Sequence, residues 1–260
     1  MTFDTIKYEK HNGIGVIILN RPEVYNALNS RCRDEMQSAL EDVENDNRIR
    51  VLIITGNEDF FCSGADINVI KKMTSASLAV DFSQRFQRLF QKIENLNKPV
   101  IAAVSGFALG GGCELALSCD VRILSENGSF GLPEIDIGAF PAGGWTQKLP
   151  RLVGMGRAKE ILFTGKRVSA QEAYDMGLAN KVVPDGDCLK TARALAEELL
   201  LKSPSAIAAI KKLVNIGSNT DLNSGLAFES ETFGALSTHR NFKEGVAAFL
   251  EKREAHFKDD

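Results

Sequence analysis

Residues 101–120, IAAVSGFALGGGCELALSCD, contain the pattern that decides the fold. An apolar run of strand-forming residues leads into Gly110, Gly111 and Gly112, and a helix-forming segment follows at once. Glycines at such a junction let a ligand approach the backbone closely, and the first N–H groups of a helix have no partner inside the helix. The junction is therefore predicted to bind an anion, or an oxygen atom on which negative charge develops.

Three short apolar runs are predicted to be buried strands: residues 14–19, 51–55 and 100–104. They are rich in Val and Ile and apolar at successive positions, which is typical of a sheet covered on both faces. Segments with helical periodicity separate them, and the two kinds alternate to about residue 190. This alternation favours an α/β architecture.

The C-terminal part of the chain is predicted to be helical. Ser169 and Glu172 form a capping box, Ser203 and Pro204 have the pattern of a second helix start, and helical periodicity continues almost without interruption after Pro184. We therefore predict an α/β core over residues 1–195 and a helical region over residues 196–260. The helical region is expected to pack on another surface, such as a second subunit.

Composition excludes several classes of protein. The 260 residues are 44% hydrophobic and 25% charged, as in ordinary globular proteins. The net charge of −3 gives no field that would attract nucleic acid or an anionic membrane. The five cysteines are scattered and odd in number, which indicates free thiols in a reducing compartment. No signal peptide and no apolar run of membrane-spanning length is apparent, so we expect a cytoplasmic protein.

Two glutamates are candidates for proton transfer. Glu114 is predicted to lie in the first turn of a helix inside an apolar segment, and Glu134 follows a proline in FGLPEIDIG. Carboxylates in apolar surroundings can take different protonation states, which suits paired acid–base work. The alternative for both is structural: Glu114 would then complement the helix dipole, and their spacing alone does not show that they meet.

Other chemistries lack their motifs. The glycines form neither G-x-G-x-x-G nor the Gly-Lys-Ser/Thr ending of a phosphate-binding loop. Cys62 and Ser63 have no plausible base among three distant histidines, and no G-x-S-x-G motif is present. The histidines also lack ligand spacing, so no metal site is predicted.

Several motifs together resemble the crotonase superfamily, the enoyl-CoA hydratase/isomerase family. They are LNRPEVYNAL (19–28), FCSGADI (61–67), ALGGGCELALSCD (108–120), FGLPEIDIG (130–138) and PAGGWTQKLPRLVG (141–154). The likeness covers nearly the whole chain. It implies a spiral of ββα units with a C-terminal helical region that supports trimerisation, usually as a dimer of trimers.

The resemblance also implies a reaction centre. The backbone N–H groups of Ala65 and Gly111 would form an oxyanion hole, in which two fixed donors stabilise the charge of a thioester enolate. Glu114 would activate the water that attacks the β-carbon, and Glu134 would supply the proton to the α-carbon. Two carboxylates favour hydration of an enoyl-CoA, since isomerases of the family commonly rely on one at the position of Glu134. Isomerisation or another acyl-CoA reaction is the alternative.

The resemblance assigns the substrate contacts as well. They are Asn26, Ala27, Leu28, Ser63, Gly64, Ala65, Asp66, Ile67, Gly110, Gly111, Trp145, Phe249 and Lys252. Coenzyme A is part of the substrate, and no metal or redox cofactor is implied. Trp145 stands where the family usually has glycine. In one interpretation its side chain only fills space in its loop. In the other it forms a wall of the acyl pocket, which would favour short or cyclic acyl groups. Phe249 and Lys252 would reach coenzyme A, in one arrangement from a neighbouring subunit.

Two non-enzymatic roles are weaker alternatives. RNA binding occurs in one branch of the superfamily, but residues 30–50 are net acidic here, which disfavours it. An inactive scaffold should have lost Glu114, Glu134 or Gly111, and all three are present. The sequence identifies neither the acyl group nor the pathway, and it leaves open whether the expected homo-oligomer is a trimer or a hexamer.

Overall fold

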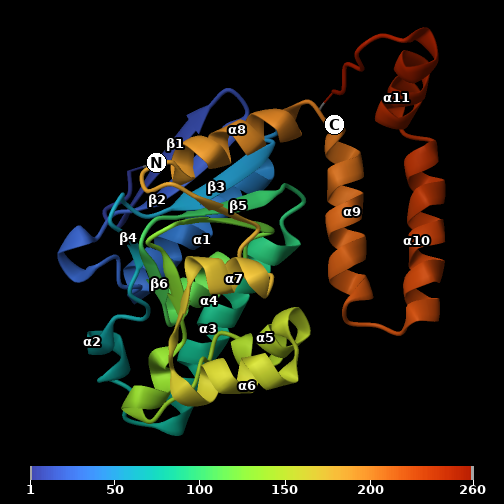
Figure 1. Cartoon of the computed structure of the whole chain (residues 1–260). Coiled ribbons are helices and arrows are strands. Elements are labelled where there is room, and N and C mark those ends of the chain that lie inside the picture. The colour runs from blue at the N-terminus through green and yellow to red at the C-terminus, as the bar shows by residue number, and fades with distance from the viewer. Residues whose placement is uncertain (1, 259–260) are drawn as a thin grey trace.

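The first sheet is built from the apolar runs of the sequence (Figure 1). The computed structural model describes residues 2–258. Among them, six strands form this sheet in the spatial order β1 (Ile6–His11), β2 (Ile14–Leu19), β3 (Val51–Thr55), β5 (Val100–Val104), β7 (Val121–Ser125) and β10 (Lys181–Val183). β1 is antiparallel to β2, and all other neighbours are parallel. The three predicted strands are confirmed with their predicted bounds.

A second sheet was not predicted. Within the described residues it contains, in spatial order, β4 (Phe60–Cys62), β6 (Phe107–Leu109), β8 (Ser129–Gly131) and β9 (Arg167–Ser169). Each strand has only three residues, too few to show a period. The predicted direct passage from the strand at 100–104 to the glycines is therefore wrong. The chain turns at Gly106, where φ is +58° and a Cβ would lie 1.9 Å from the Asp59 carbonyl oxygen, and β6 comes before the helix.

The two sheets combine into repeated ββα units. β3 and β4 lead into α2 (Ile67–Ile70) and α3 (Ala76–Asn95), and β5 and β6 lead into α4 (Gly111–Leu117). β7 and β8 lead into the 3₁₀ helix η2 (Pro133–Ile137). Successive first strands lie side by side in one sheet and successive second strands in the other. The predicted spiral of ββα units is confirmed.

Helices cover both faces of the first sheet. On one face, α1 (Ser30–Asn45) and α3 bury Met36, Leu40 and Phe90 in the main core with strand residues such as Leu52. On the other face, α8 (Cys188–Leu200) packs Ala192 and neighbouring residues against the remaining strand side chains. Around the second sheet lie α5 (Trp145–Val153), α6 (Met155–Thr164) and α7 (Ala170–Asp175). α7 begins with the predicted capping box of Ser169 and Glu172.

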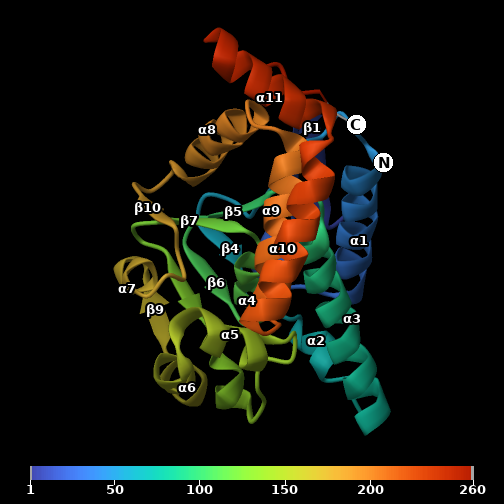
Figure 2. The same ribbon diagram turned by 90° about the vertical axis from the view of Figure 1, so that its right-hand side faces the viewer.

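Three helices extend beside this core (Figures 1 and 2). α9 (Pro204–Gly217) and α10 (Leu222–Ser237) form a hairpin, and α11 (Arg240–Glu251) follows. Lys211 of α9 anchors the hairpin, because its buried ammonium donates to Asp120 Oδ2 at 2.7 Å and to the Ile93 carbonyl at 3.1 Å. The boundary predicted at residue 195 lies within α8, and the division into two domains stays a prediction.

Candidate active site

The local fold places Glu114 at the buried start of α4. Gly110 has φ +49° and precedes the first helical residue, so Glu114 falls in the first turn of a short helix that is buried throughout. Its side chain is nearly inaccessible, at 5% exposure for the residue. One carboxylate oxygen, Oε1, accepts a hydrogen bond from the Gly143 N–H at 2.8 Å. The Trp145 indole donates to the Glu114 backbone carbonyl at 3.1 Å. The segment that leads into α5 therefore holds Glu114 in place.

Glu134 reaches the same region from η2. Pro133 starts this 3₁₀ helix, and Glu134 follows it directly. Its Oε1 lies 3.2 Å from the position that a Cβ on Gly110 would occupy, so the carboxylate faces the start of α4. Its other oxygen, Oε2, is buried and has no hydrogen-bond partner among the described residues. Leaving such an oxygen without a partner is costly, which suits a group that binds a proton or a ligand.

Burial and proximity change the acidity of both carboxyls. Burial, together with the nearby charge of Glu134, raises the pKa of Glu114 to about 8 even though the Gly143 N–H opposes the shift. Burial also raises the pKa of Glu134, to about 6. Because the charge of one acts on the other, the two titrate as a pair. At pH 7, between these two values, we expect the pair to hold a single proton.

Two backbone N–H groups lie next to each other beside this pair. A Cβ on Gly111 would lie 3.4 Å from the Ala65 nitrogen, and a Cβ on Gly64 would lie 3.3 Å from the Gly111 nitrogen. An isolated parallel β-bridge pairs Leu28 with Ala65, but its hydrogen bonds are donated by the N–H groups of Leu28 and Asp66 and leave the Ala65 N–H unused. Neither the Ala65 nor the Gly111 N–H donates a hydrogen bond within residues 2–258. The two amides can therefore serve one acceptor from outside the chain.

Several predicted contact residues hold the site together through their side chains. Asn26 is buried and donates to the Phe61 carbonyl at 3.0 Å while accepting from the Arg21 N–H at 2.9 Å. Asp66 caps α2 and accepts from Arg21 Nη1 at 3.0 Å. Arg21 thus ties the segment around Asn26 to the loop that carries Ala65. Sequence analysis missed this role, although Arg21 lies within the quoted motif LNRPEVYNAL.

Trp145 lies in the core. It is 3% exposed, begins α5, and its one polar atom binds the Glu114 carbonyl. These contacts give it a structural role beside the glutamate. A role as a wall of the acyl pocket stays a prediction.

The two predicted residues of the C-terminal region lie elsewhere. Phe249 is 83% exposed near the end of α11, and Lys252 caps that helix. α11 lies beyond α9 and α10, at the edge of the molecule and away from α4 (Figures 1 and 2). Their contact with substrate, from a neighbouring subunit, stays a prediction.

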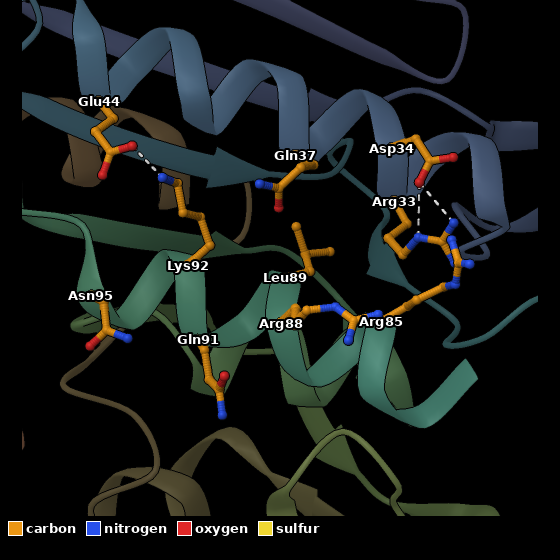
Figure 3. A pocket seen from close by; sticks show the side chains of 10 residues that line it. All are labelled: Arg33, Asp34, Gln37, Glu44, Arg85, Arg88, Leu89, Gln91, Lys92 and Asn95. Carbon is orange, nitrogen blue, oxygen red and sulfur yellow. Dashed lines mark hydrogen bonds and ion pairs between the residues drawn. The ribbon is translucent and has the colours of Figure 1, made fainter. Parts of the chain in front are cut away.

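A separate cavity of about 480 Å³ lies between α1 and α3 (Figure 3). Its lining combines Arg33, Arg85, Arg88 and Lys92 with two carboxylates and includes none of the predicted site residues. Within residues 2–258, no three His, Cys, Asp or Glu side chains are arranged to hold a metal ion. No described helix is long and apolar enough to cross a membrane.

Known proteins resemble the chain along its whole length. The profile of the enoyl-CoA hydratase/isomerase family matches residues 9–260. The short-chain-enoyl-CoA hydratase of Clostridium acetobutylicum is 42% identical over 254 residues, which cover 97% of each chain. The crotonyl-CoA hydratase of Syntrophomonas wolfei is 43% identical over 258 residues, which cover 99% of each. The crystal structure of an enoyl-CoA hydratase from Bacillus anthracis is 36% identical, superposes with a TM-score of 0.94, and is matched over 99% of this chain and 100% of that one.

Proposed function

The chain belongs to the enoyl-CoA hydratase/isomerase family, and we propose that it adds water reversibly across the α,β double bond of a short-chain enoyl-CoA thioester. One observation carries the proposal: the buried Glu114 and the half-buried Glu134 lie beside two backbone N–H groups that donate no hydrogen bond within residues 2–258. Relatives named for short-chain enoyl-CoA and crotonyl-CoA hydration support the choice of acyl group.

The two N–H groups would stabilise the negative charge that develops on the thioester during the reaction. The thioester carbonyl oxygen would accept from Ala65 and Gly111. Attack on the β-carbon moves electrons onto this oxygen, and fixed donors that need no reorganisation stabilise the developing charge. The conformations of Gly64 and Gly110 matter here, since φ of +111° and +49° lets the two loops approach closely.

The glutamates supply the proton transfers. A water held between them would give one proton to the Glu114 carboxylate as its oxygen bonds to the β-carbon, and Glu134 would give its proton to the α-carbon. The proton of the pair thus moves from Glu134 to Glu114 during hydration and back during dehydration.

An absorbance assay tests this function. Purified protein is mixed with a panel of enoyl-CoA thioesters that includes crotonyl-CoA and cyclic enoyl-CoAs, and loss of the conjugated double bond is followed. We expect turnover with the short-chain members. No turnover of any member by folded protein would contradict the proposal.

The pH profile of this reaction should be bell-shaped. Below about pH 6 both carboxyls hold protons and no base remains, and above about pH 8 both are ionised and no acid remains. We therefore expect kcat/KM for crotonyl-CoA to fall on both sides of this window, since it reports the ionisations of the free enzyme. Circular dichroism at each pH serves as the control for unfolding. A constant kcat/KM from pH 5 to pH 9 would contradict the shared proton.

Assembly into a homotrimer or a dimer of trimers is part of the proposal. No apolar residue of α9 or α10 is buried, and the two helices expose Ile210, Val214, Leu226 and Phe233. Exposed apolar side chains gathered on neighbouring elements mark interaction surfaces. We expect light scattering to give the mass of three or six chains, and a monomer at micromolar concentration would contradict this. A neighbouring subunit would also bring Phe249 and Lys252 toward coenzyme A.

Coenzyme A enters this scheme as part of the substrate, and every step uses groups of the chain and water. No metal or redox cofactor has a role in it. The five cysteines are free and buried, which suits a reducing compartment such as the cytoplasm.

A further inference from the structure

Three phenylalanines on α3 form a row that begins at the proposed active site. Phe82, Phe86 and Phe90 are spaced four residues apart, so they share one face of the helix. The ring centroids of Phe82 and Phe86 are 4.8 Å apart, and those of Phe86 and Phe90 are 5.9 Å apart. Phe86 and Phe90 are buried, and Phe82 is partly buried.

The inner end of the row adjoins Glu114. A Cβ on Gly143 would lie 2.5 Å from the Phe90 ring atom Cε2 and 2.7 Å from Glu114 Oε2. The ring and the carboxylate therefore flank the same glycine, whose N–H binds the other oxygen of Glu114. An acyl group whose β-carbon faces a water on Glu114 would meet this ring as an apolar wall.

The outer end of the row lies at a cavity of about 350 Å³ that is lined by α1, α2, α3 and the segment between α2 and α3. Phe82 is part of its wall, and its other apolar lining residues are Val69, Met73 and Leu78. The rim is polar and includes Arg33, Lys72 and Arg85. The cavity and the carboxylate pair therefore lie at opposite ends of one row of rings, with Phe86 in the middle.

We propose that Phe86 and Phe90 set the length of the acyl chain and that the cavity beyond them is a distal acyl subsite, closed off in the wild-type protein. This inference rests on the proposed hydratase function. A packed core has no room for additional carbons, so a chain that runs along the wall formed by Phe90 ends against the buried ring of Phe86. The site therefore favours short acyl chains, and shortening Phe86 would connect it to the cavity.

The test compares kcat/KM for enoyl-CoAs of four, six, eight and ten carbons. In the wild type we expect a fall of about tenfold to a hundredfold between four and eight carbons, the range expected when a filled site is overpacked. Phe86→Ala should raise the ratio of eight- to four-carbon activity by about tenfold or more. Phe86→Leu, which keeps more of the core and so folds more readily, should raise it in the same direction.

Leu89→Ala is the matched control. Leu89 is also buried on α3, at 1% exposure, but its side chain points toward α1 and lines the cavity of Figure 3. Its truncation disturbs the same helix without shortening the row, so the ratio should stay at the wild-type value. An unchanged ratio in both Phe86 variants, or an equal gain in Leu89→Ala, would overturn the inference.

The outcomes separate this inference from the function on which it rests. Wild-type protein that hydrates four- and eight-carbon substrates equally well would overturn the length limit and leave the hydratase function intact. Wild-type protein that hydrates none of the four would contradict the function itself.

Discussion

Glu114→Gln and Glu134→Gln are each expected to lower kcat for crotonyl-CoA hydration by about 10²–10⁴-fold, the usual effect of removing a positioned acid or base. Glutamine keeps the shape of the side chain but neither accepts nor releases a proton at neutral pH. The change also removes a buried ionisable group, so we expect the variants to fold. Stopped-flow or steady-state absorbance with saturating substrate measures the loss.

The double variant tests whether the two glutamates act as a unit. Because both act on one water, removing the second should cost far less than removing the first, and the combined loss should fall well short of the product of the two single losses. Losses that multiply would show two independent roles. Glu172→Gln is a suitable control, since this exposed capping residue lies in α7 outside the site and should leave kcat near the wild-type value.

The second large effect concerns the backbone donors. Gly111→Pro deletes one N–H of the oxyanion hole, and a loss of about 10²–10³-fold in kcat is expected. Proline suits this position, because Gly111 is the first residue of α4 and proline is favoured at the start of a helix. Ala65→Pro deletes the other N–H and should have an effect of the same size.

Gly111→Ala separates the lost donor from the added bulk. A Cβ on Gly111 would make contacts of 3.4 Å or more, so alanine fits while keeping the N–H. The loss in Gly111→Pro should exceed that in Gly111→Ala by most of the predicted factor. Equal kcat values for the two variants, or an unchanged rate in a folded Ala65→Pro protein, would contradict the assignment of these donors.

Much of the fold could be predicted because buried parallel strands are recognisable as short, continuous apolar runs in the sequence. β2, β3 and β5 are apolar at nearly every position, and their predicted bounds match the structure. The second sheet could not be found in this way. Its three-residue strands owe their position to neighbours such as Gly106, where a close approach to Asp59 forces the turn, rather than to their own composition.

The site was predictable in its residue types but not in its geometry. Glu134 faces the start of the helix that carries Glu114 because Gly110, just before α4, donates to the Gly131 carbonyl at 2.8 Å, and η2 begins two residues after Gly131. This contact depends on the pairing of β6 with β8, which no local pattern indicates. The hydrogen bond from Gly143 to Glu114 and the position of Phe90 beside it likewise come from the packing of distant segments.

Isotope labelling of the product tests the central claim, that Glu114 and Glu134 add one water across the double bond, most directly. Crotonyl-CoA is incubated with the protein in ¹⁸O-labelled water or in D₂O, and the thioester product is analysed by mass spectrometry and NMR. We expect a 3-hydroxyacyl thioester with one heavy oxygen on the β-carbon and, in D₂O, one deuterium on the α-carbon, both lost in the Glu114→Gln, Glu134→Gln double variant. A product without added oxygen, whose double bond has moved to the β,γ position, would contradict the account and indicate an isomerase.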